Sequence, residues 1–477
     1  MHLERTMLKS SKESSQKSSK QNTQKDSTNP QTKAQNQSTL ITPRTLSGFR
    51  DYLPKEAMAK EKLIASLTTV FESFGFAPIE TPHLEYAEIL LRQGSDEIQK
   101  ELYRFVDNGG RDVVLRFDQT VPLARFITQY RNELDLPFKR FAIGNVFRGE
   151  RAQKGRYREF TQCDFDFIGS DSIGCDAEII EVIYASLSAL GLDEFTIWVN
   201  HRSVLNGIAE HFGIRDSKDL ESFLRLIDKL DKIGEENLAK ELQSTLKLDS
   251  KKVDEIISLI SIKQITQRDE FFASVAHLKE WNAELKKGIE ELESCFRILS
   301  SVQMATSSCR VSFAIARGLG YYTGIVYETT LNRLKSLGSV CSGGRYDNLT
   351  RSFSRERISG VGASIGLDRL LAGLEELGVL RGKGTSAEVL IVCMREEFIA
   401  YAHQIAQSLR RSKIYTEVYP QATKLQKSLS YANNKGHEHC IIIGENEFST
   451  QTLTIKNMTT GVQFDSISLL RVIEIVK

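Results

Sequence analysis

The chain has 477 residues, of which 40% are hydrophobic, and it carries a formal net charge of +1 at pH 7. This length predicts about three domains, and the near-neutral charge excludes a strong polyanion-binding footprint over the whole molecule. Seven scattered cysteines without a C-x-x-C pair exclude a disulfide framework or a zinc site and indicate a reducing compartment, so we expect a cytoplasmic protein. No apolar run approaches the roughly 20 residues that cross a bilayer, and we expect no membrane contact.

Residues 1–38 form a polar segment that differs from the rest of the chain. Serine, threonine, glutamine, lysine and asparagine dominate it, and apolar residues are almost absent. Such a composition cannot bury enough surface to offset the entropy of ordering, so we predict a disordered tail. The segment also lacks the apolar core of a secretory signal.

The first folded region is predicted to mix helices with antiparallel strands. Apolar residues at helical spacing are followed by Gly75, which is placed to cap that helix. Residues 76–85 read as extended. The runs 103–106 and 113–116 flank Asp107-Asn108-Gly109-Gly110, which indicates a hairpin. This order is typical of an α+β sheet domain rather than of alternating βαβ units.

A basic stretch separates two further predicted strands, 141–147 and 159–167. Four arginines and a lysine crowd the eleven positions from Arg148 to Arg158. Alternate residues of the second strand place an aromatic, an amide and two acids on one face, opposite an apolar face. Arginines above such a floor suit a polyphosphate at the rim and a small cationic ligand on the floor, because the guanidinium fork matches phosphate oxygens. The residues of the polar face are Phe160, Gln162, Asp164 and Asp166.

The second half of the sheet domain is predicted to follow a helical insertion at about residues 206–301. Leucine, isoleucine, lysine and glutamate recur there at helical spacing. Strands are then predicted at 310–317 and 324–330, and a glycine-rich turn at 341–347. A glycine-rich run that ends at Gly366 leads into another helix.

A glycine-rich linker at 381–385 is predicted to separate residues 39–383 from a smaller domain at 384–477. The smaller domain alternates strands and helices from Val389 on, as in an α/β fold with right-handed crossovers. The predicted fold class is therefore α+β, with an antiparallel sheet domain, its helical insertion and a small α/β domain.

The glycine loops of the two standard nucleotide-binding motifs are absent by spacing, so arginine side chains would have to hold any nucleotide. Arg148, Arg156, Arg317 and Arg369 each stand beside a glycine turn or in an apolar context. Such a set of cations favours a nucleotide triphosphate site. The acids that accompany them are Asp118, Glu150 and Asp166.

Two segments resemble histidine-specific signatures of the histidyl-tRNA synthetase family. The first signature is matched by Arg317-Gly318-Leu319-Gly320-Tyr321-Tyr322-Thr323-Gly324, and the second by Cys341 to Asp347. Gly320 stands where that family often has an acidic residue. The resemblance runs roughly from Leu46 to the C-terminus and implies the class II synthetase fold, with a catalytic domain at 39–383 and an anticodon-binding domain at 384–477. Segments that resemble its motifs 1, 2 and 3 and its amine-binding segment are the surroundings of Pro82, Phe147–Phe160, Gly360–Leu371 and Leu115–Thr120.

The resemblance implies a two-step reaction. Histidine and ATP give histidyl-adenylate and pyrophosphate, and tRNA then takes the histidyl group. Arg148 is implied to bridge the histidine carboxylate and the α-phosphate, and Arg317 to stabilise the pentavalent phosphate, so these two are the expected catalytic residues. Phe160 is implied to stack on adenine. The implied site for ATP, which arrives with Mg²⁺, consists of Arg148, Glu150, Arg156, Phe160 and Arg369.

A histidine site and a homodimer are also implied. Asp118 and Thr120 are expected to receive the α-amine, and Asp166 can accept an imidazole N–H. The full expected histidine site is Asp118, Gln119, Thr120, Arg148, Gln162, Asp166, Arg317, Tyr321, Tyr322 and Tyr346.

The alternative from another class is a non-catalytic, histidine-sensing regulatory subunit of histidine biosynthesis, which resembles the same family. Such a protein lacks an anticodon-binding domain and can lose the ATP arginines, whereas this chain has four candidate arginines and the additional residues 384–477. We therefore prefer ATP-dependent ligation of histidine to its cognate tRNA, with release of AMP and pyrophosphate. The balanced charge of the C-terminal region argues against a pure RNA-binding module.

Overall fold

The computed structural model describes residues 40–91, 99–151, 155–264, 267–302, 304, 307–318, 321–379 and 383–477. The predicted disordered tail, Gly320 and part of the predicted linker lie outside these residues. Within the described ranges, no helix is both long enough and apolar enough to cross a membrane.

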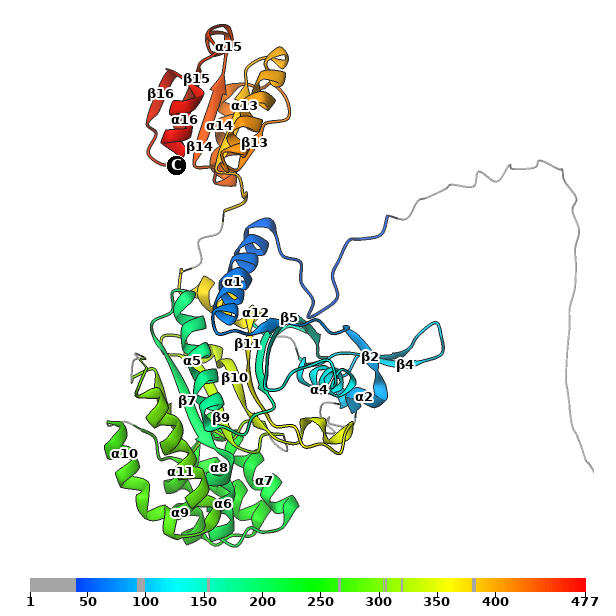
Figure 1. The fold of residues 1–477 in the computed structure, drawn as a ribbon, viewed down its shortest axis with the longest axis vertical. Coiled ribbons are helices and arrows are strands. Elements are labelled where there is room, and N and C mark those ends of the chain that lie inside the picture. The colour runs from blue at the N-terminus through cyan, green and yellow to red at the C-terminus, as the bar shows by residue number, and fades with distance from the viewer. Residues whose placement is uncertain are drawn as a thin grey trace, which may run out of the picture. The chain divides into compact units, whose positions relative to one another are not determined.

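The core of the first region is a sheet of eight strands: β1 (Ala77–Pro78), β5 (Phe138–Phe147), β6 (Glu159–Ile168), β7 (Phe195–His201), β8 (Cys309–Val311), β9 (Ile325–Leu331), β10 (Ser339–Tyr346) and β11 (Gly360–Gly366). Their order in the sheet is β1-β5-β6-β11-β10-β9-β7-β8. Figure 1 labels β5, β11, β10, β9 and β7 of this sheet. Neighbours are antiparallel except at the two edges, where β1 pairs with β5 and β8 with β7 in parallel. The predicted antiparallel α+β sheet is confirmed.

A smaller sheet accompanies it, with strands β2 (Leu84–Tyr86), β3 (Arg104–Val106) and β4 (Asp112–Leu115) in the order β2-β4-β3. The predicted hairpin is confirmed, because β3 and β4 pair antiparallel. Asp107 shapes its turn by accepting the backbone N–H groups of Gly109 and Arg111, each at 2.9 Å. In the chain, helix α2 (Ala87–Leu91) lies between β2 and β3, and helix α4 (Thr120–Gln129) follows β4.

Three helices pack with the apolar side of the large sheet: α1 (Pro54–Ser73), α5 (Ile173–Ala189) and α12 (Leu367–Glu376). Helix α1 begins with proline in its first turn, and Gly75 follows its C-cap with φ of +81°, a value that glycine adopts without strain. The apolar face of β6 turns toward α1, where the rings of Phe165 and Phe71 lie 4.9 Å apart. The opposite, polar face of β6 is thereby left for a site.

The predicted helical insertion is confirmed between β7 and β8, although its limits as a domain stay a prediction. Its helices are grouped together in Figure 1. The first begins at Arg202, because the His201 ring caps it by accepting the backbone N–H of Ser203 at 3.1 Å. The helices are α6 (Arg202–His211), α7 (Ser217–Asp228), α8 (Leu230–Leu246), α9 (Ser250–Ile260), α10 (Arg268–Val275), the 3₁₀ turn η1 (Ala276–Glu280) and α11 (Ala283–Leu299).

The predicted glycine-rich turn at 341–347 is wrong, because residues 341–346 belong to strand β10, which lies inside the sheet between β11 and β9. A Cβ on Gly343 would lie 2.1 Å from the carbonyl oxygen of Gly362, and one on Gly344 would lie 2.7 Å from that of Ile325. The glycines therefore serve close backbone approach within the sheet rather than a change of direction.

The predicted strand at 310–317 is also wrong beyond Val311. The side-chain amide of Asn200 donates to the carbonyl oxygens of Phe313 and Ile315, at 3.1 and 2.9 Å. These two hydrogen bonds satisfy backbone carbonyl groups that would otherwise pair with a neighbouring strand. Arg317 consequently lies in an irregular segment that follows β8, and not at a strand end.

The C-terminal region has its own five-stranded sheet, with strands β12 (Val389–Cys393), β13 (Thr416–Val418), β14 (His439–Ile443), β15 (Leu453–Asn457) and β16 (Gln463–Ile467). Strand β12 is parallel to β13 and β14, which confirms the predicted α/β pattern, and β15 and β16 extend the sheet antiparallel. Its helices are α13 (Ile399–Arg411), α14 (Leu425–Lys435), α15 (Glu445–Thr450) and α16 (Leu469–Val476). The remaining 3₁₀ turns of the described chain are η2 (Lys335–Leu337), η3 (Leu349–Ser352) and η4 (Glu396–Phe398).

Candidate active site

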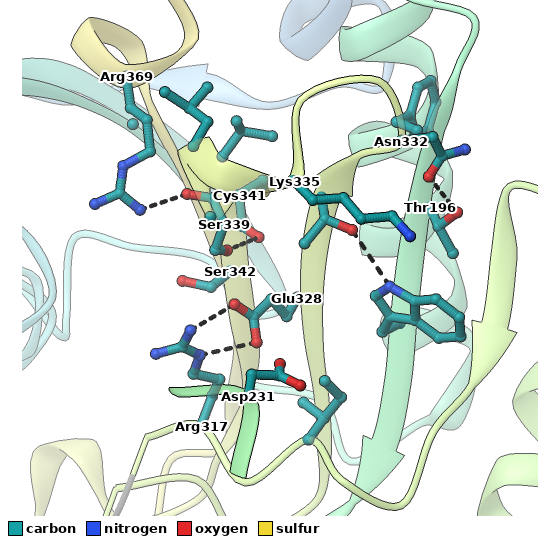
Figure 2. Close-up of a pocket in the computed structure, with 18 of the residues that line it drawn as sticks. Thr196, Asp231, Arg317, Glu328, Asn332, Lys335, Ser339, Cys341, Ser342 and Arg369 are labelled. Carbon is teal, nitrogen blue, oxygen red and sulfur yellow. Dashed lines mark hydrogen bonds and ion pairs between the residues drawn. The ribbon is translucent and has the colours of Figure 1, made fainter. Parts of the chain in front are cut away.

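A cavity of about 1430 Å³ lies over the polar face of the large sheet, and Figure 2 shows part of its lining. Side chains from β6, β9, β10 and β11 reach it, together with residues from the insertion and from the start of α12. All five residues predicted for the ATP site line this cavity. Gln162, which is predicted to bind histidine, and Arg317, which is predicted to bind histidine and to be catalytic, line it as well. The predicted residues in the lining are Arg148, Glu150, Arg156, Phe160, Gln162, Arg317 and Arg369.

Strand register extends the polar face predicted from β6 across the sheet. Asp164 pairs with Ser364 on β11, and Ser364 pairs with Ser342 on β10. Ser342 in turn pairs with Glu328 on β9. Directly paired residues share one face of a sheet, so these polar side chains form a row. Sequence reasoning missed Glu328, although an acid within an otherwise apolar strand is a signal that could have found it.

Arg317 reaches Glu328 from the irregular segment after β8 (Figure 2). Its Nε and Nη2 atoms donate to the two carboxylate oxygens of Glu328 at 2.9 and 2.5 Å. A third guanidinium nitrogen lies 3.6 Å from a carboxylate oxygen of Asp228, at the end of α7. Burial acts to lower the pKa of Arg317, but the hydrogen bonds to Glu328 outweigh it and raise the pKa above its ordinary value. The cavity therefore holds a firmly oriented cation at this point.

Arg369 adds a second cation at the top of Figure 2, where its guanidinium donates to the carbonyl oxygen of Ser339 at 2.6 Å. Burial, followed by the charges of Arg156 and Arg317, lowers the pKa of Arg369. In addition to the effect of burial, the like charges of Arg156 and Arg317 therefore repel the charge of Arg369. Anionic groups placed among them would relieve that repulsion.

Arg148 and Phe160 are neighbours at the rim of the same cavity. Arg148 donates from Nε to the carbonyl oxygen of Phe117 at 2.9 Å, and its guanidinium carbon lies 5.2 Å from the ring centroid of Phe160. Glu150 approaches Arg148 at 3.7 Å and forms an ion pair with Arg156. The rim thus combines an aromatic face with two cations on either side of one carboxylate.

The remaining predicted residues are not in the cavity lining. Several of them form a polar cluster around Asp166, which is 4% exposed. The Tyr346 hydroxyl donates to Asp166, and the Tyr346 and Tyr321 rings lie 5.4 Å apart. Tyr321 and Tyr322 meet edge to face at 5.0 Å. The structure therefore brings together tyrosines from β10 and from the segment after β8, as the resemblance implied.

Arg140, which sequence reasoning missed, forms the other side of this cluster. It is fully buried, and its Nη2 lies 2.6 Å from a carboxylate oxygen of Asp166. Gly362 pairs with Asp166 from the opposite strand, and a Cβ there would lie 2.0 Å from the carboxylate. Burial raises the pKa of Asp166, opposed by Arg140 and by the Tyr346 hydrogen bond. In the sequence, Lys139-Arg140 reads as an exposed basic pair, so only the strand register reveals this partner.

The predicted amine-binding residues lie at the start of α4. A carboxylate oxygen of Asp118 accepts the backbone N–H of Val121 at 3.2 Å, and burial raises the pKa of Asp118 to about 6. Gln119 is buried, and its amide donates to the carbonyl oxygens of Ala142 and Gln162 at 3.3 and 3.0 Å. Gln119 thus ties this helix start to the two strands β5 and β6, and Thr120 follows as the first residue of α4.

Gln162 lines the cavity and is also tied to the start of α4, because its carbonyl oxygen accepts from the Gln119 amide. Its amide nitrogen donates to the Ser364 hydroxyl at 3.0 Å, and its buried amide oxygen has no hydrogen-bond partner. A buried acceptor in this state calls for a donor from a ligand or from water. Among the described residues, no group of three or more His, Cys, Asp or Glu side chains is arranged to hold a metal ion.

Comparisons with known proteins agree over most of the chain. The family described as "Histidyl-tRNA synthetase" matches residues 48–370, and the family described as "Anticodon binding domain" matches residues 388–477. A histidine–tRNA ligase of Helicobacter hepaticus is 64% identical over 438 residues, which cover 92% of this chain and 99% of that protein. The corresponding ligase of Wolinella succinogenes is 61% identical, with coverage of 91% and 98%. A crystal structure of histidyl-tRNA synthetase from Nostoc sp. PCC 7120 superposes with a TM-score of 0.83 at 33% identity, covering 92% of this chain and 99% of that one.

Proposed function

The chain belongs to the histidyl-tRNA synthetase family, and on that premise we propose that its cavity binds ATP while the Asp166 cluster binds histidine. The protein is a class II histidine–tRNA ligase, which charges tRNA with histidine. The regulatory alternative is not favoured, because the ligases match nearly the whole chain and an anticodon-binding domain follows the synthetase domain.

The observation that carries the ATP proposal is that Arg148, Arg156, Arg317 and Arg369 all line one cavity. A triphosphate is a ligand whose several charges would meet several guanidinium groups at once. Phe160, beside Arg148, offers an aromatic face for adenine. We assign Arg148, Glu150, Arg156, Phe160 and Arg369 to ATP.

The histidine proposal rests on the buried carboxylate of Asp166 and the free amide oxygen of Gln162. The imidazole ring carries N–H donors that a carboxylate and an amide oxygen can accept. Asp118 supplies an acid for the α-amine. The remaining members that we assign to this site are Gln119, Thr120, Tyr321, Tyr322 and Tyr346, with Arg148 and Arg317 at the carboxylate end.

The chemistry of the first step needs no general base. An α-carboxylic acid with a pKa near ~3.5 is already ionised at neutral pH, so the histidine carboxylate can attack the α-phosphate of ATP directly, and pyrophosphate leaves. Catalysis then consists of placing the two anions together and stabilising the charge that develops. We propose that Arg148 bridges the two reacting groups and that Arg317 stabilises the pentavalent phosphate.

Mg²⁺ enters this proposal as part of the ATP substrate. The carboxylates beside the arginines, Glu150 and Glu328, are both engaged in ion pairs, and the described residues form no metal cluster of their own. Mg²⁺ usually keeps several waters and binds through substrate phosphates with one or two carboxylates. The residues present fit that mode, with the phosphates supplying most of the ligands.

The test of the function is ATP–pyrophosphate exchange with each amino acid in turn, followed by charging of purified tRNA. Exchange should depend on histidine, and charging should be confined to histidine tRNA. Exchange that depends on another amino acid would overturn the assignment of the Asp166 cluster. Binding of histidine without any exchange would instead support a regulatory protein.

Separating the two regions of the chain should separate the two steps. We propose that residues 39–383 are the catalytic domain and 384–477 the anticodon-binding domain. Their buried apolar residues cluster separately, up to Leu374 in the first and from Val389 in the second. A protein of residues 39–383 should retain histidine-dependent exchange and lose most tRNA charging, because RNA sequence is read mainly from single-stranded loops by a dedicated surface.

The comparison uses wild-type and anticodon-substituted histidine tRNA at one fixed salt concentration, since the non-specific part of RNA affinity depends on salt. Full-length protein should discriminate between the two tRNAs, and the shortened protein should not. Equal discrimination by both proteins would show that another region reads the anticodon.

We also propose a homodimer in the cytoplasm. The small sheet next to the Pro82 segment exposes apolar side chains, with Tyr86, Phe105 and Val106 at 49%, 46% and 68% exposure. Tyr86 and Phe105 are both in register with Val113 and so share one face of this sheet, and an exposed apolar face suits an isologous interface. All seven cysteines are free and buried, which agrees with a reducing compartment.

Light scattering at micromolar concentration should therefore give the mass of two chains. Replacing both Phe105 and Val106 with glutamate should shift the protein to a monomer, because charges would be buried at the interface. Leu470→Glu, at a site that is 75% exposed in the C-terminal region, serves as the matched control and should leave the mass unchanged. A monomeric wild-type protein would refute the dimer.

A further inference from the structure

Arg202, the first residue of α6, makes an unusual set of contacts with the segment that carries Arg317. It is 6% exposed. Its Nη2 donates to the carbonyl oxygens of Arg317 and Gly318 at 2.6 and 3.0 Å, and its Nε donates to that of Tyr322 at 3.3 Å. Its backbone N–H also donates to the carbonyl oxygen of Gly324 at 2.8 Å. The Arg202 guanidinium thus holds the segment at two places, at Arg317 and Gly318 and again at Tyr322.

The described residues of this segment, 317–318 and 321–324, lie outside any strand, so individual contacts rather than a strand ladder hold their shape. Gly318 has φ of +65°, and the Tyr322 ring packs so closely that a Cβ on Gly318 would lie 1.9 Å from it. The backbone N–H groups of Tyr321 and Tyr322 both donate to the Gly318 carbonyl oxygen at 3.1 Å. Carbonyl groups that converge in this way need buried donors, and Arg202 supplies them.

Charge strengthens the arrangement. Hydrogen bonds from an ionised donor are roughly twice as strong as neutral ones, and carbonyl oxygens are the negative ends of their dipoles. Burial lowers the pKa of Arg202 to about 10, so the side chain stays charged at neutral pH. The planar fork also fixes the carbonyl positions relative to one another, which a lysine ammonium cannot do as well.

We propose that Arg202 is a positioning residue for adenylate formation. It fixes Arg317, on the phosphate side, and Tyr321 and Tyr322, on the histidine side, as one unit. Arg202 touches neither substrate in this assignment and acts through the carbonyl groups of Arg317, Gly318 and Tyr322. The inference rests on the proposed roles of Arg317 and the two tyrosines. It also links the insertion to catalysis, because α6 belongs to the insertion.

The test measures ATP–pyrophosphate exchange by full-length wild type, Arg202→Ala and a control, Arg268→Ala. Arg268 lies in α10, where it donates to the carbonyl oxygen of Phe296 at 2.8 Å and to the Ser300 hydroxyl, both at the C-terminal end of α11. Displacing a catalytic group by about 1 Å can cost 10²-fold in rate. We therefore expect kcat of Arg202→Ala to fall about 10²-fold with KM for ATP within a few-fold of wild type. Arg268→Ala should keep its kcat, even where its melting temperature drops equally.

A double-mutant cycle separates positioning from general destabilisation. In an Arg317→Ala background, Arg202→Ala should cause a much smaller further loss of kcat than it does in wild type, because its effect on the phosphate side passes through Arg317. Arg202→Lys is the milder variant and covers the case in which Arg202→Ala does not fold; it should lose part of kcat while remaining folded.

The outcomes distinguish the inference from its premise. If wild type shows no histidine-dependent exchange, the proposed function fails. If wild type is active and folded Arg202→Ala or Arg202→Lys keeps full kcat, the positioning role is wrong. Losses from Arg202→Ala and Arg317→Ala that multiply in the double variant would also overturn it.

Discussion

Arg317→Ala should lower the rate of ATP–pyrophosphate exchange by about 10²–10³ while leaving the histidine requirement nearly unchanged. Removing one preorganised group that stabilises developing charge typically costs about 3–4 kcal/mol in the transition state. Arg317 is already oriented by two hydrogen bonds to Glu328, so little reorganisation is needed when the phosphate becomes pentavalent. The loss should therefore appear mainly in kcat.

Two further variants make this measurement decisive. Arg310 lines the same cavity and donates to the carbonyl oxygen of Ser307 at 3.2 Å. Arg310→Ala removes a cation of the same type and should leave kcat close to wild type. Glu328→Gln keeps the shape of the anchor but removes its charge, so we expect a smaller loss than for Arg317→Ala. Near-normal exchange by Arg317→Ala would eliminate its catalytic role.

The local pattern of β6 was sufficient to predict one face of the site. Its period of two separates Phe160 and Gln162, which line the cavity, from Phe165, which packs on α1. That inference needed only neighbouring residues, because side chains alternate along any strand. The arginines at the cavity were found for a similar reason, since each stands out against its own local sequence.

Residues whose roles depend on other strands could not be predicted in this way. Arg140 and Glu328 are placed by the pairing of β5 with β6 and of β9 with β10, and the pairing brings together positions far apart in the chain. The glycines of β10 resemble a turn in the local sequence. They are required because a side chain at these positions would collide with the carbonyl oxygens of Gly362 and Ile325 on the adjacent strands. Register is a tertiary property, and one sequence does not display it.

Asp166→Ala should raise the histidine requirement far more than the ATP requirement. The carboxylate lies in the buried cluster with Tyr346 and Arg140, while the arginines proposed for ATP line the cavity. A hydrogen bond to a charged group contributes about 1.5–3 kcal/mol, so KM for histidine should rise roughly 10- to 100-fold. Gln162→Ala should act in the same direction, because its free amide oxygen is the other proposed acceptor.

Stability must be separated from binding in this experiment, because Arg140 is fully buried. Removing Asp166 leaves a buried guanidinium without its partner, which typically costs 3–5 kcal/mol. Asp166→Asn keeps the size of the side chain and an acceptor for the Tyr346 hydroxyl. Thermal unfolding of each variant then identifies a temperature at which all of them remain folded.

Asp164→Asn is the matched control. This acid lies two residues away on the same face of β6, is 3% exposed and pairs with Ser364 on β11. At a temperature where every variant is folded, the Asp166 variants should show a raised KM for histidine, and Asp164→Asn should show little change. If KM for ATP rose as much as KM for histidine, Asp166 would hold the sheet together through Arg140 rather than recognise the imidazole.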